Sequence, residues 1–424
     1  MGKNLSTIQS PSVKTGTAIK HRRNLRQYFT ISPNGVVTAA ADNDPTGIAT
    51  YLQAGATTGL SLLWLVAILV PLASAVEEMS ARVGVVTKKG ITRLIREHYG
   101  VGVAMVVAAI TAICNIVAIS AGIEVVADLL ALFTPIPSIA WIVIVAGLLV
   151  WLLIKNGYQL VSRYLIGATV VLMLYVITAI IIRPDWLSVA QHFVSPVIHI
   201  EQLWLLAALG IVGNTLAPYL IIWQTTEELE SKKTIHDLRQ EATGVIWGFV
   251  YSGVIAASII ITAAVVYAAA PGLITSTADA ALALKPIAGQ WALILFGLGM
   301  LVSGILGIPV LVASTAYMSA EALHWREGLG KSWHKVGGFY GIIIITCILA
   351  AIMTLANLPS MVTLLYSQVL SGALTPIMLF IMLLMGNNPR IMGRHINPWL
   401  SNLLGGLALA LVLGLDVIWL LIYC

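Results

Sequence analysis

Long apolar runs separated by short polar segments fill the chain from about residue 32 almost to its last residue. A helix needs about 20 residues to cross the hydrocarbon core of a bilayer. Eleven runs reach that scale and predict spanning helices near 32–56, 60–81, 101–133, 138–154, 160–182, 202–225, 243–270, 290–320, 339–356, 361–386 and 398–423. The pattern therefore predicts an all-α polytopic membrane protein of eleven transmembrane helices.

The composition agrees with this prediction. Hydrophobic residues make up 59% of the 424 residues and charged residues only 10%, whereas soluble domains carry about 25% charged residues. Water-soluble enzymes and nucleic-acid-binding proteins are therefore excluded, and the lipid bilayer is the expected partner. The three cysteines lie far apart in apolar surroundings, which indicates neither a disulfide framework nor a metal knuckle.

The distribution of basic residues predicts the orientation of the chain. If residues 1–30, which are polar and basic, form a cytosolic tail, 21 Lys and Arg fall on the cytosolic side and only Arg183 and Lys285 fall outside. Such an excess is typical of cytosolic loops. We therefore expect an integral protein of the cytoplasmic membrane with its N-terminus in the cytosol and its C-terminus outside. The charged segment around Ile91–Tyr99 is expected to lie along the interface.

Two predicted spans carry interruptions at mid-membrane depth. Residues 42–47 of the first read Asp-Asn-Asp-Pro-Thr-Gly, and residues 213–218 of the sixth read Gly-Asn-Thr-Leu-Ala-Pro. Proline and glycine break helices there, and unwound backbone at that depth is tolerated only where it is buried in protein or lines a cavity. Because the breaks are five spans apart, the second group of five starts from the opposite face. This predicts an inverted repeat of residues 31–183 and 202–387, followed by an eleventh helix at 397–424.

A few acidic residues remain within the spans, where no Lys or Arg lies mid-span to neutralise them. Asp44 lies at the first break, and Glu124 lies midway along the third span. Carboxylates at such depth are functional candidates by default and require a cation or a proton. A protonated Glu124 bonded to a neighbouring helix is the alternative for that residue. The other acids near span ends are expected to be interfacial (Asp128, Asp416) or to bracket the cytosolic mouth or pair with Arg82 (Glu77, Glu78).

The residues available at the breaks favour a hard cation. All eight histidines fall outside the span centres, and no methionine or cysteine lies near the break of the sixth span. Carboxylate, amide, hydroxyl and carbonyl oxygens suit Mg²⁺, Ca²⁺ and Mn²⁺, whereas imidazole and sulfur suit transition metals.

The sequence resembles the NRAMP family of divalent-metal transporters. Residues 44–47, Asp-Pro-Thr-Gly, are similar to its first-span signature Asp-Pro-Gly-Asn, and the similarity extends from about residue 33 to 390, including Gly122-Ile-Glu124 and Ser367-Gln368. The resemblance implies the leucine-transporter fold with broken helices 1 and 6. It also implies a transporter rather than an enzyme, with no cofactor and no obligate protein partner.

The departures from the family pattern resemble those of its magnesium-transporting branch. Gly47 stands where the family has an asparagine ligand, Ala217 where it has a methionine, and Tyr219 where it has a histidine associated with proton movement. The usual glutamine of the tenth span is matched to Leu374, and the acid that usually precedes Glu124 is Ala121.

The smaller side chains are expected to enlarge the site for a partly hydrated ion, because Mg²⁺ usually keeps several waters. Asp44 and Glu124 would carry the charge. Contacts to the ion or its waters are expected at the break residues Asn43, Thr46, Gly47 and Asn214 and at the carbonyl of Ala217.

The sequence thus predicts a Mg²⁺ transporter that also admits Mn²⁺ and works passively by alternating access. Two alternatives are a proton-coupled Mn²⁺/Fe²⁺ importer and an organic-solute symporter of the same fold, and a receptor or sensor role is a third. An intramembrane enzyme is disfavoured, because no serine–histidine motif, no dicarboxylate motif with Gly-x-Gly-Asp and no zinc motif is present.

Overall fold

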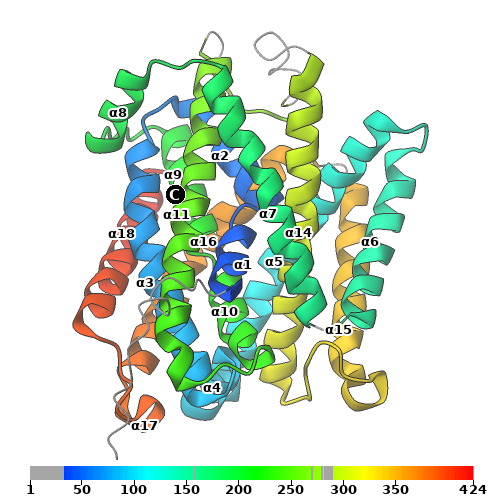
Figure 1. The fold of residues 1–424 in the computed structure, drawn as a ribbon, viewed down its shortest axis with the longest axis vertical. Helices are drawn as coiled ribbons and strands as arrows, with labels where there is room; N and C mark the ends of the chain where they lie inside the picture. Colours follow the sequence, from blue (N-terminus) through cyan, green and yellow to red (C-terminus); the bar gives the residue numbers. More distant parts are fainter. Residues whose placement is uncertain are drawn as a thin grey trace, which may run out of the picture. The chain divides into compact units, whose positions relative to one another are not determined.

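The computed structural model describes residues 33–423 apart from 157, 269–270, 278–279, 281–289 and 357. The predicted tail at 1–30 and Lys285 lie outside the described residues. The described part is built of helices (Figure 1), namely α1 Pro33–Ala41, α2 Pro45–Thr58, α3 Leu63–Thr87, α4 Ile91–Tyr99, α5 Val101–Phe133, α6 Ser138–Lys155, α7 Tyr158–Ile181, α8 Trp186–Val194, α9 Gln202–Thr215, α10 Pro218–Glu230, α11 Leu238–Val266, α14 Gln290–Leu323, α15 Trp333–Met353, α16 Ser360–Gly386, α17 Pro389–Met392 and α18 Trp399–Tyr423. Two short 3₁₀ turns lie at Ile235–Asp237 and Thr354–Ala356.

Each predicted apolar run coincides with a helix or with a pair of consecutive helices. Within the described residues, nine helical segments are long and apolar enough to cross a membrane, and a tenth is added if the bent pair Thr169–Ile181 and Trp186–Val194 counts as one span. The first predicted run is divided between α1 and α2, which have 9 and 14 residues and are each too short to cross alone. The count of eleven spans therefore stays a prediction.

The helices fall into two groups of five with similar lengths. Helices α3, α5, α6 and α7 have 25, 33, 18 and 24 residues, and their counterparts α11, α14, α15 and α16 have 29, 34, 21 and 27. Each group opens with a broken helix, α1–α2 in the first and α9–α10 in the second. The division into two repeats, at 31–183 and 202–387, stays a prediction.

The broken helices lie in the interior of the bundle. Helix α1 packs against α7, α10, α11 and α14, and α2 packs against α9, α11, α14 and α16. In Figure 1 both are the dark blue ribbons near the centre of the view, beside α11. Because nearly every side chain of α2, α9 and α10 is buried, the unwound backbone between the half-helices is shielded from lipid by protein.

Helix α4 packs on the bundle with its apolar side. Ile91, Leu94 and Ile95 are buried against protein, and the buried carboxylate of Glu321 on α14 accepts a hydrogen bond from the backbone N–H of Arg93 at 3.2 Å. The apolar face that was expected to lie along the interface is thus covered by neighbouring helices. Arg93 and Arg96 of α4 are half-buried, whereas Glu97 and His98 are exposed.

A buried glutamine joins α2 to the loop that follows α11. Gln53 donates from Nε2 to the carbonyl oxygen of Ile274 at 2.5 Å and accepts from the N–H of the same residue at 2.9 Å. Gln53 is completely buried. A glutamine amide carries a donor and an acceptor, as a peptide group does. Gln53 therefore satisfies both the N–H and the carbonyl oxygen of Ile274.

Candidate metal site at two helix breaks

The first break turns Asp44 into the N-cap of α2. Pro45 occupies the first position of that helix, where its missing N–H costs nothing. Asp44 Oδ1 accepts from the N–H of Gly47 at 2.8 Å and from the hydroxyl of Thr46. The positive end of the α2 dipole also favours a negative charge here. The sequence around the break therefore fixes a carboxylate that is completely buried and held by neutral donors.

Asp42, two residues earlier, is held by other neutral groups. Its Oδ2 accepts from the hydroxyl of Ser252 on α11 and from Tyr51 at 3.2 Å, and its Oδ1 accepts from Asn214 Nδ2 at 2.7 Å. Asn43 donates to Ser252 at 2.9 Å, while Asn43 Oδ1 is buried and accepts no hydrogen bond within the described part of the chain. That amide oxygen is available to a ligand.

The second break lies between Thr215, the last residue of α9, and Pro218, the first of α10. Ala217 is the N-cap of α10, and its carbonyl accepts from the N–H of Leu220 at 3.0 Å. The carbonyl predicted to contact the ion is thus also the first acceptor of α10. The same oxygen also accepts a longer bond from the N–H of Ile221 at 3.5 Å, so its contact to an ion stays a prediction.

Two side chains of the second repeat join the breaks. Asn214 Nδ2 lies within hydrogen-bonding distance of both the carbonyl and the carboxylate of Asp42, at 2.8 and 2.7 Å. Tyr219 reaches Asp44 Oδ2 at 3.2 Å and the carbonyl of Ala41 at 3.3 Å. The residues that flank the neutral break therefore supply two of the donors that position the carboxylates of the charged one.

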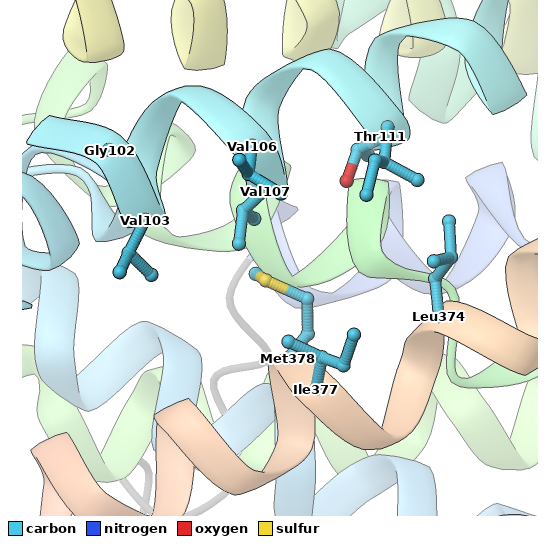
Figure 2. A pocket seen from close by; sticks show the side chains of 9 residues that line it. Gly102, Val103, Val106, Val107, Thr111, Leu374, Ile377 and Met378 are labelled. Atoms are coloured by element: carbon cyan, nitrogen blue, oxygen red, sulfur yellow. The ribbon is translucent and has the colours of Figure 1, made fainter.

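Helix α16 contributes a residue that was not among the predicted site residues. Gln368 donates from Nε2 to the hydroxyl of Thr46, and its buried Oε1 accepts no hydrogen bond from any described residue. Leu374, matched above to the usual glutamine, instead lines an apolar cavity of about 490 Å³ between α5 and α16 (Figure 2). The two residues are six positions apart and so lie on different faces of α16, and it is Gln368 that faces the site.

Gly47 allows the two breaks to approach each other closely. A Cβ at this position would overlap the carbonyl oxygen of Asp42 and would lie 2.9 Å from Asn214 Nδ2. In this conformation the space beside Gly47 is thus occupied by an oxygen and an amide. The larger pocket inferred from the small residues at 47 and 217 stays a prediction.

Glu124 lies apart from this cluster. Gly122 on α5 faces Pro45, since a Cβ added to this glycine would lie 3.9 Å from the proline Cγ. Glu124 comes two positions later and therefore points about 200° away around the helix. Glu124 is half-buried and interacts electrostatically with Asp128 one turn along, which itself accepts from Ser138 at 2.6 Å. The structure does not bring Glu124 to Asp44, so its role as a metal ligand stays a prediction.

The two acids of α3 have different surroundings. Glu78 forms an ion pair with Arg82, one of the two roles expected for this pair of residues. Glu77 is 1% exposed and neither of its carboxylate oxygens is hydrogen-bonded to a described residue. Asp416 is half-buried on α18.

The groups around Asp44 that could bind a metal ion are all oxygen atoms, which are hard ligands. Within the residues that the structure describes, no three His, Cys, Asp or Glu side chains are grouped so that they could hold a metal ion. Asp44 instead has hydroxyl, amide and carbonyl oxygens around it. One or two carboxylates supplemented by neutral oxygens and water is the arrangement by which proteins usually bind Mg²⁺.

Residues 35–422 match the sequence profile of the family described as Nramp, natural resistance-associated macrophage protein-like. The chain belongs to the Nramp family. Among its relatives are divalent metal cation transporters named MntH from Granulibacter bethesdensis, 25% identical over 91% of this chain and 87% of that protein, and from Bacillus subtilis, 25% identical over 90% and 89%. These Nramp relatives are transporters and not enzymes.

Solved structures support the fold class. A manganese transporter from Eremococcus coleocola superposes with a TM-score of 0.75 and 19% identity, covering 98% of this chain and 89% of that one. The transporter Mhp1, of the nucleobase-cation-symport-1 family, superposes with a TM-score of 0.59 and 12% identity over 93% and 94%. The predicted fold class, an all-helical integral membrane protein of the Nramp and leucine-transporter type, is confirmed.

Proposed function

We propose that this Nramp protein is a divalent metal cation transporter that carries Mg²⁺, and also Mn²⁺, by alternating access. Its relatives are named divalent metal cation and manganese transporters, which supports metal transport in general. The observation that carries the proposal is the buried Asp44 at two opposed helix breaks, surrounded by neutral oxygen groups. Discontinuous helices in corresponding halves mark the substrate site of this kind of transporter.

The preference for Mg²⁺ rests on the chemistry of the available oxygens. Asn43 Oδ1 and Gln368 Oε1 are buried amide oxygens without a hydrogen bond from a described residue, and both lie on side chains that contact the site through their nitrogens. Ala217 offers no thioether to a softer metal. Oxygen-only sites favour hard cations such as Mg²⁺ and Mn²⁺ over Cd²⁺ or Cu²⁺.

The absence of proton coupling is proposed from Tyr219. Its hydroxyl lies 3.2 Å from Asp44 Oδ2, at the position where the family resemblance places a histidine. A histidine changes its charge near neutral pH, whereas a phenol keeps its proton. Tyr219 therefore orients Asp44 but does not exchange protons with the cytosol during a transport cycle.

Alternating access requires two parts that move relative to each other. We assign these parts to the repeats at 31–183 and 202–387, with helix 397–424 outside both, the N-terminus in the cytosol and the C-terminus outside. Each repeat contributes one half of the bonded pair of breaks, through Asp42 and Asp44 on one side and Asn214 and Tyr219 on the other. Movement of the repeats would therefore change the ion site directly.

The test is uptake by the purified protein in liposomes. Mg²⁺ influx is followed with an internal indicator, Mn²⁺, Ca²⁺ and Cd²⁺ are added as competitors, and internal pH is recorded in parallel. We expect Mg²⁺ uptake that Mn²⁺ inhibits and Cd²⁺ does not, with no change in internal pH.

Three results would contradict parts of this proposal. Acidification that tracks metal entry would show proton coupling, and uptake of Cd²⁺ in preference to Mg²⁺ would indicate a site of the ordinary Mn²⁺/Fe²⁺ type. No flux of any divalent cation above that of protein-free liposomes would contradict metal transport itself.

A further inference from the structure

Glu77 is a buried carboxyl group to which the site at Asp44 assigns no role. It lies on α3, is 1% exposed, and neither Oε1 nor Oε2 has a hydrogen-bond partner among the described residues. A buried carboxylate is unfavourable unless a cation or several donors compensate its charge. Its neighbour Glu78, by contrast, is paired with Arg82. Glu77 therefore has the surroundings of a ligand whose partner comes from solution.

The position of Glu77 along α3 places it between the Asp44 site and the cytosol. Residues seven apart share a helix face, so Val70, Glu77 and Gly84 face the same way. A Cβ added to Gly253, the residue after Ser252, would lie 2.5 Å from Cγ2 of Val70, so Val70 packs on Gly253. A Cβ added to Gly84 would lie 2.6 Å from the carbonyl oxygen of Thr225, so Gly84 packs on α10. At about 1.5 Å per residue, Glu77 lies about 10 Å closer to the cytosol than Val70.

The charged groups that act on Glu77 agree with this placement. Its carboxylate interacts electrostatically with Asp42 above it and with Glu227 on α10. Glu227 is completely buried, and its Oε2 accepts from Thr38 on α1 at 2.8 Å. Carboxylates from the first break, α3 and α10 thus follow one another from Asp42 toward the far end of α10.

Gln224 adds a neutral oxygen to this region. It lies one turn before Glu227 on α10 and is completely buried, with Oε1 accepting no hydrogen bond from the described residues. Its Nε2 donates to Glu228 at 2.7 Å, which holds the side chain in place. Two carboxylates, an amide oxygen and water form a ligand set that Mg²⁺ accepts.

We propose that Glu77, with Glu227 as its second carboxylate, forms a second cation position that the transported ion occupies between Asp44 and the cytosol. This inference rests on the proposed function, because it takes the ion to be a divalent metal cation. The position shortens the distance over which the ion would cross a low-dielectric interior without a counter-charge. It also explains why a carboxyl group without a hydrogen-bonding partner is retained at this depth.

The test counts Mn²⁺ binding to the purified full chain, by the loss of the free Mn²⁺ signal in electron paramagnetic resonance. The variants are Asp44→Ala, Glu77→Gln and the combination of both, and Glu78→Gln is the matched control on the adjacent residue. We expect Asp44→Ala to retain a weaker Mn²⁺ site. Adding Glu77→Gln should weaken that remaining site by at least about tenfold, the lower end of what loss of a metal-site group costs, whereas Glu78→Gln should leave Mn²⁺ binding as in the wild type.

The results separate this inference from the proposed function. If the wild type binds and transports no metal, the proposed function fails. If the wild type binds Mn²⁺ but Asp44→Ala binds none, or if the double variant binds as well as Asp44→Ala, the second position is wrong.

Thermal unfolding separates ligation from a structural role. Without metal, Glu77→Gln is expected to be at least as stable as the wild type, since it removes an uncompensated acid. Mn²⁺ should raise the midpoint of Asp44→Ala and not that of the double variant. If Glu77→Gln does not fold, Glu227→Gln in the Asp44→Ala background should abolish the same Mn²⁺ binding. Internal acidification during uptake that Glu77→Gln removes would identify Glu77 as a proton carrier and overturn the inference.

Discussion

The break between α1 and α2 and the break between α9 and α10 occupy corresponding positions, but their residues differ. The first contains two carboxylates, Asp42 and Asp44, and the second consists of Leu216 and Ala217. Both helices resume at a proline, Pro45 or Pro218, so the backbone interruption is common to both. The difference between the breaks is therefore chemical, with charge on one side and none on the other.

This difference suggests a division of tasks between the repeats. Asn214 on α9 and Tyr219 on α10 donate to Asp42 and Asp44 at the first break. Because these donors are neutral, they orient the carboxylates and leave the charge available to a cation. Substitutions at the first break should thus abolish transport, whereas substitutions at the second should weaken it.

The largest effect is expected for Asp44→Ala. This variant loses the charged group at the centre of the site, and Mg²⁺ uptake in liposomes should fall by more than about 100-fold, beyond the range for loss of a supporting group. Asn214→Ala, a change in the last turn of α9 just before the second break, should reduce uptake by about 10-fold. Equal losses in the two variants would contradict the division of tasks.

Folding of both variants is checked by size-exclusion chromatography and thermal unfolding. Asp44→Ala also removes the N-cap of α2, which typically stabilises a helix by about 1 kcal/mol. Asp44→Asn keeps a capping side chain and loses the charge, so it should remain as inactive as Asp44→Ala.

A glycine of α14 packs directly against the charged break. A Cβ on Gly307 would overlap the Cβ of Asp44, so Gly307→Ala should displace the carboxylate, reduce uptake strongly and lower stability by about 1–3 kcal/mol. Gly297→Ala on the same helix is the matched control, because its nearest neighbour would lie 3.4 Å away. If both variants unfold at the same temperature and transport equally well, close packing at Asp44 is not required.

The bond that joins the two breaks is tested by Tyr219→Phe. The variant keeps the ring and loses the hydroxyl near Asp44 Oδ2; a hydrogen bond to a charged group contributes about 1.5–3 kcal/mol, so uptake should fall by about tenfold or more. Tyr51→Phe removes a bond to Asp42 instead and should have a smaller effect. A larger loss for Tyr51→Phe would indicate that Asp42 and not Asp44 carries the ion.

The smallest effect on Mg²⁺ uptake is expected for Ala217→Met. The new thioether would lie at the neutral break, where it adds a soft ligand without removing any oxygen. Competition assays should show stronger inhibition of Mg²⁺ uptake by Cd²⁺. Unchanged inhibition by Cd²⁺ would mean that residue 217 does not set selectivity.

The position of the breaks could be predicted from the sequence, but not which residues of other helices surround them. Proline and glycine within apolar runs predicted the positions of Asp44 and Asn214. In the structure, Asn214 is hydrogen-bonded to Thr46 and Asp42, the residues two positions either side of Asp44. Gln368 could not be placed in the same way. Helix α16 is apolar on most sides, so its pattern does not indicate which face is turned toward α2.

The same limit explains the acids of α3 and α5. Glu77 and Glu78 are adjacent in sequence, yet one is buried without a hydrogen bond and the other is paired with Arg82, because consecutive helix residues point about 100° apart. Glu124 lies at a depth suited to the site but on another face of its helix. Hydropathy predicts depth in the membrane, whereas orientation around a helix depends on the packing of the whole bundle.

Helix α2 carries Asp44 at one end and an attachment to the loop after α11 near the other. Asp44 and Gln53 are nine residues apart, about 13 Å along the helix axis, and Gln53 holds the peptide group of Ile274 through two hydrogen bonds. Because a helix of 14 residues moves as a rigid rod, a tilt that displaces Asp44 also pulls on this loop. The proposed ion site and this loop are thus joined through a single helix.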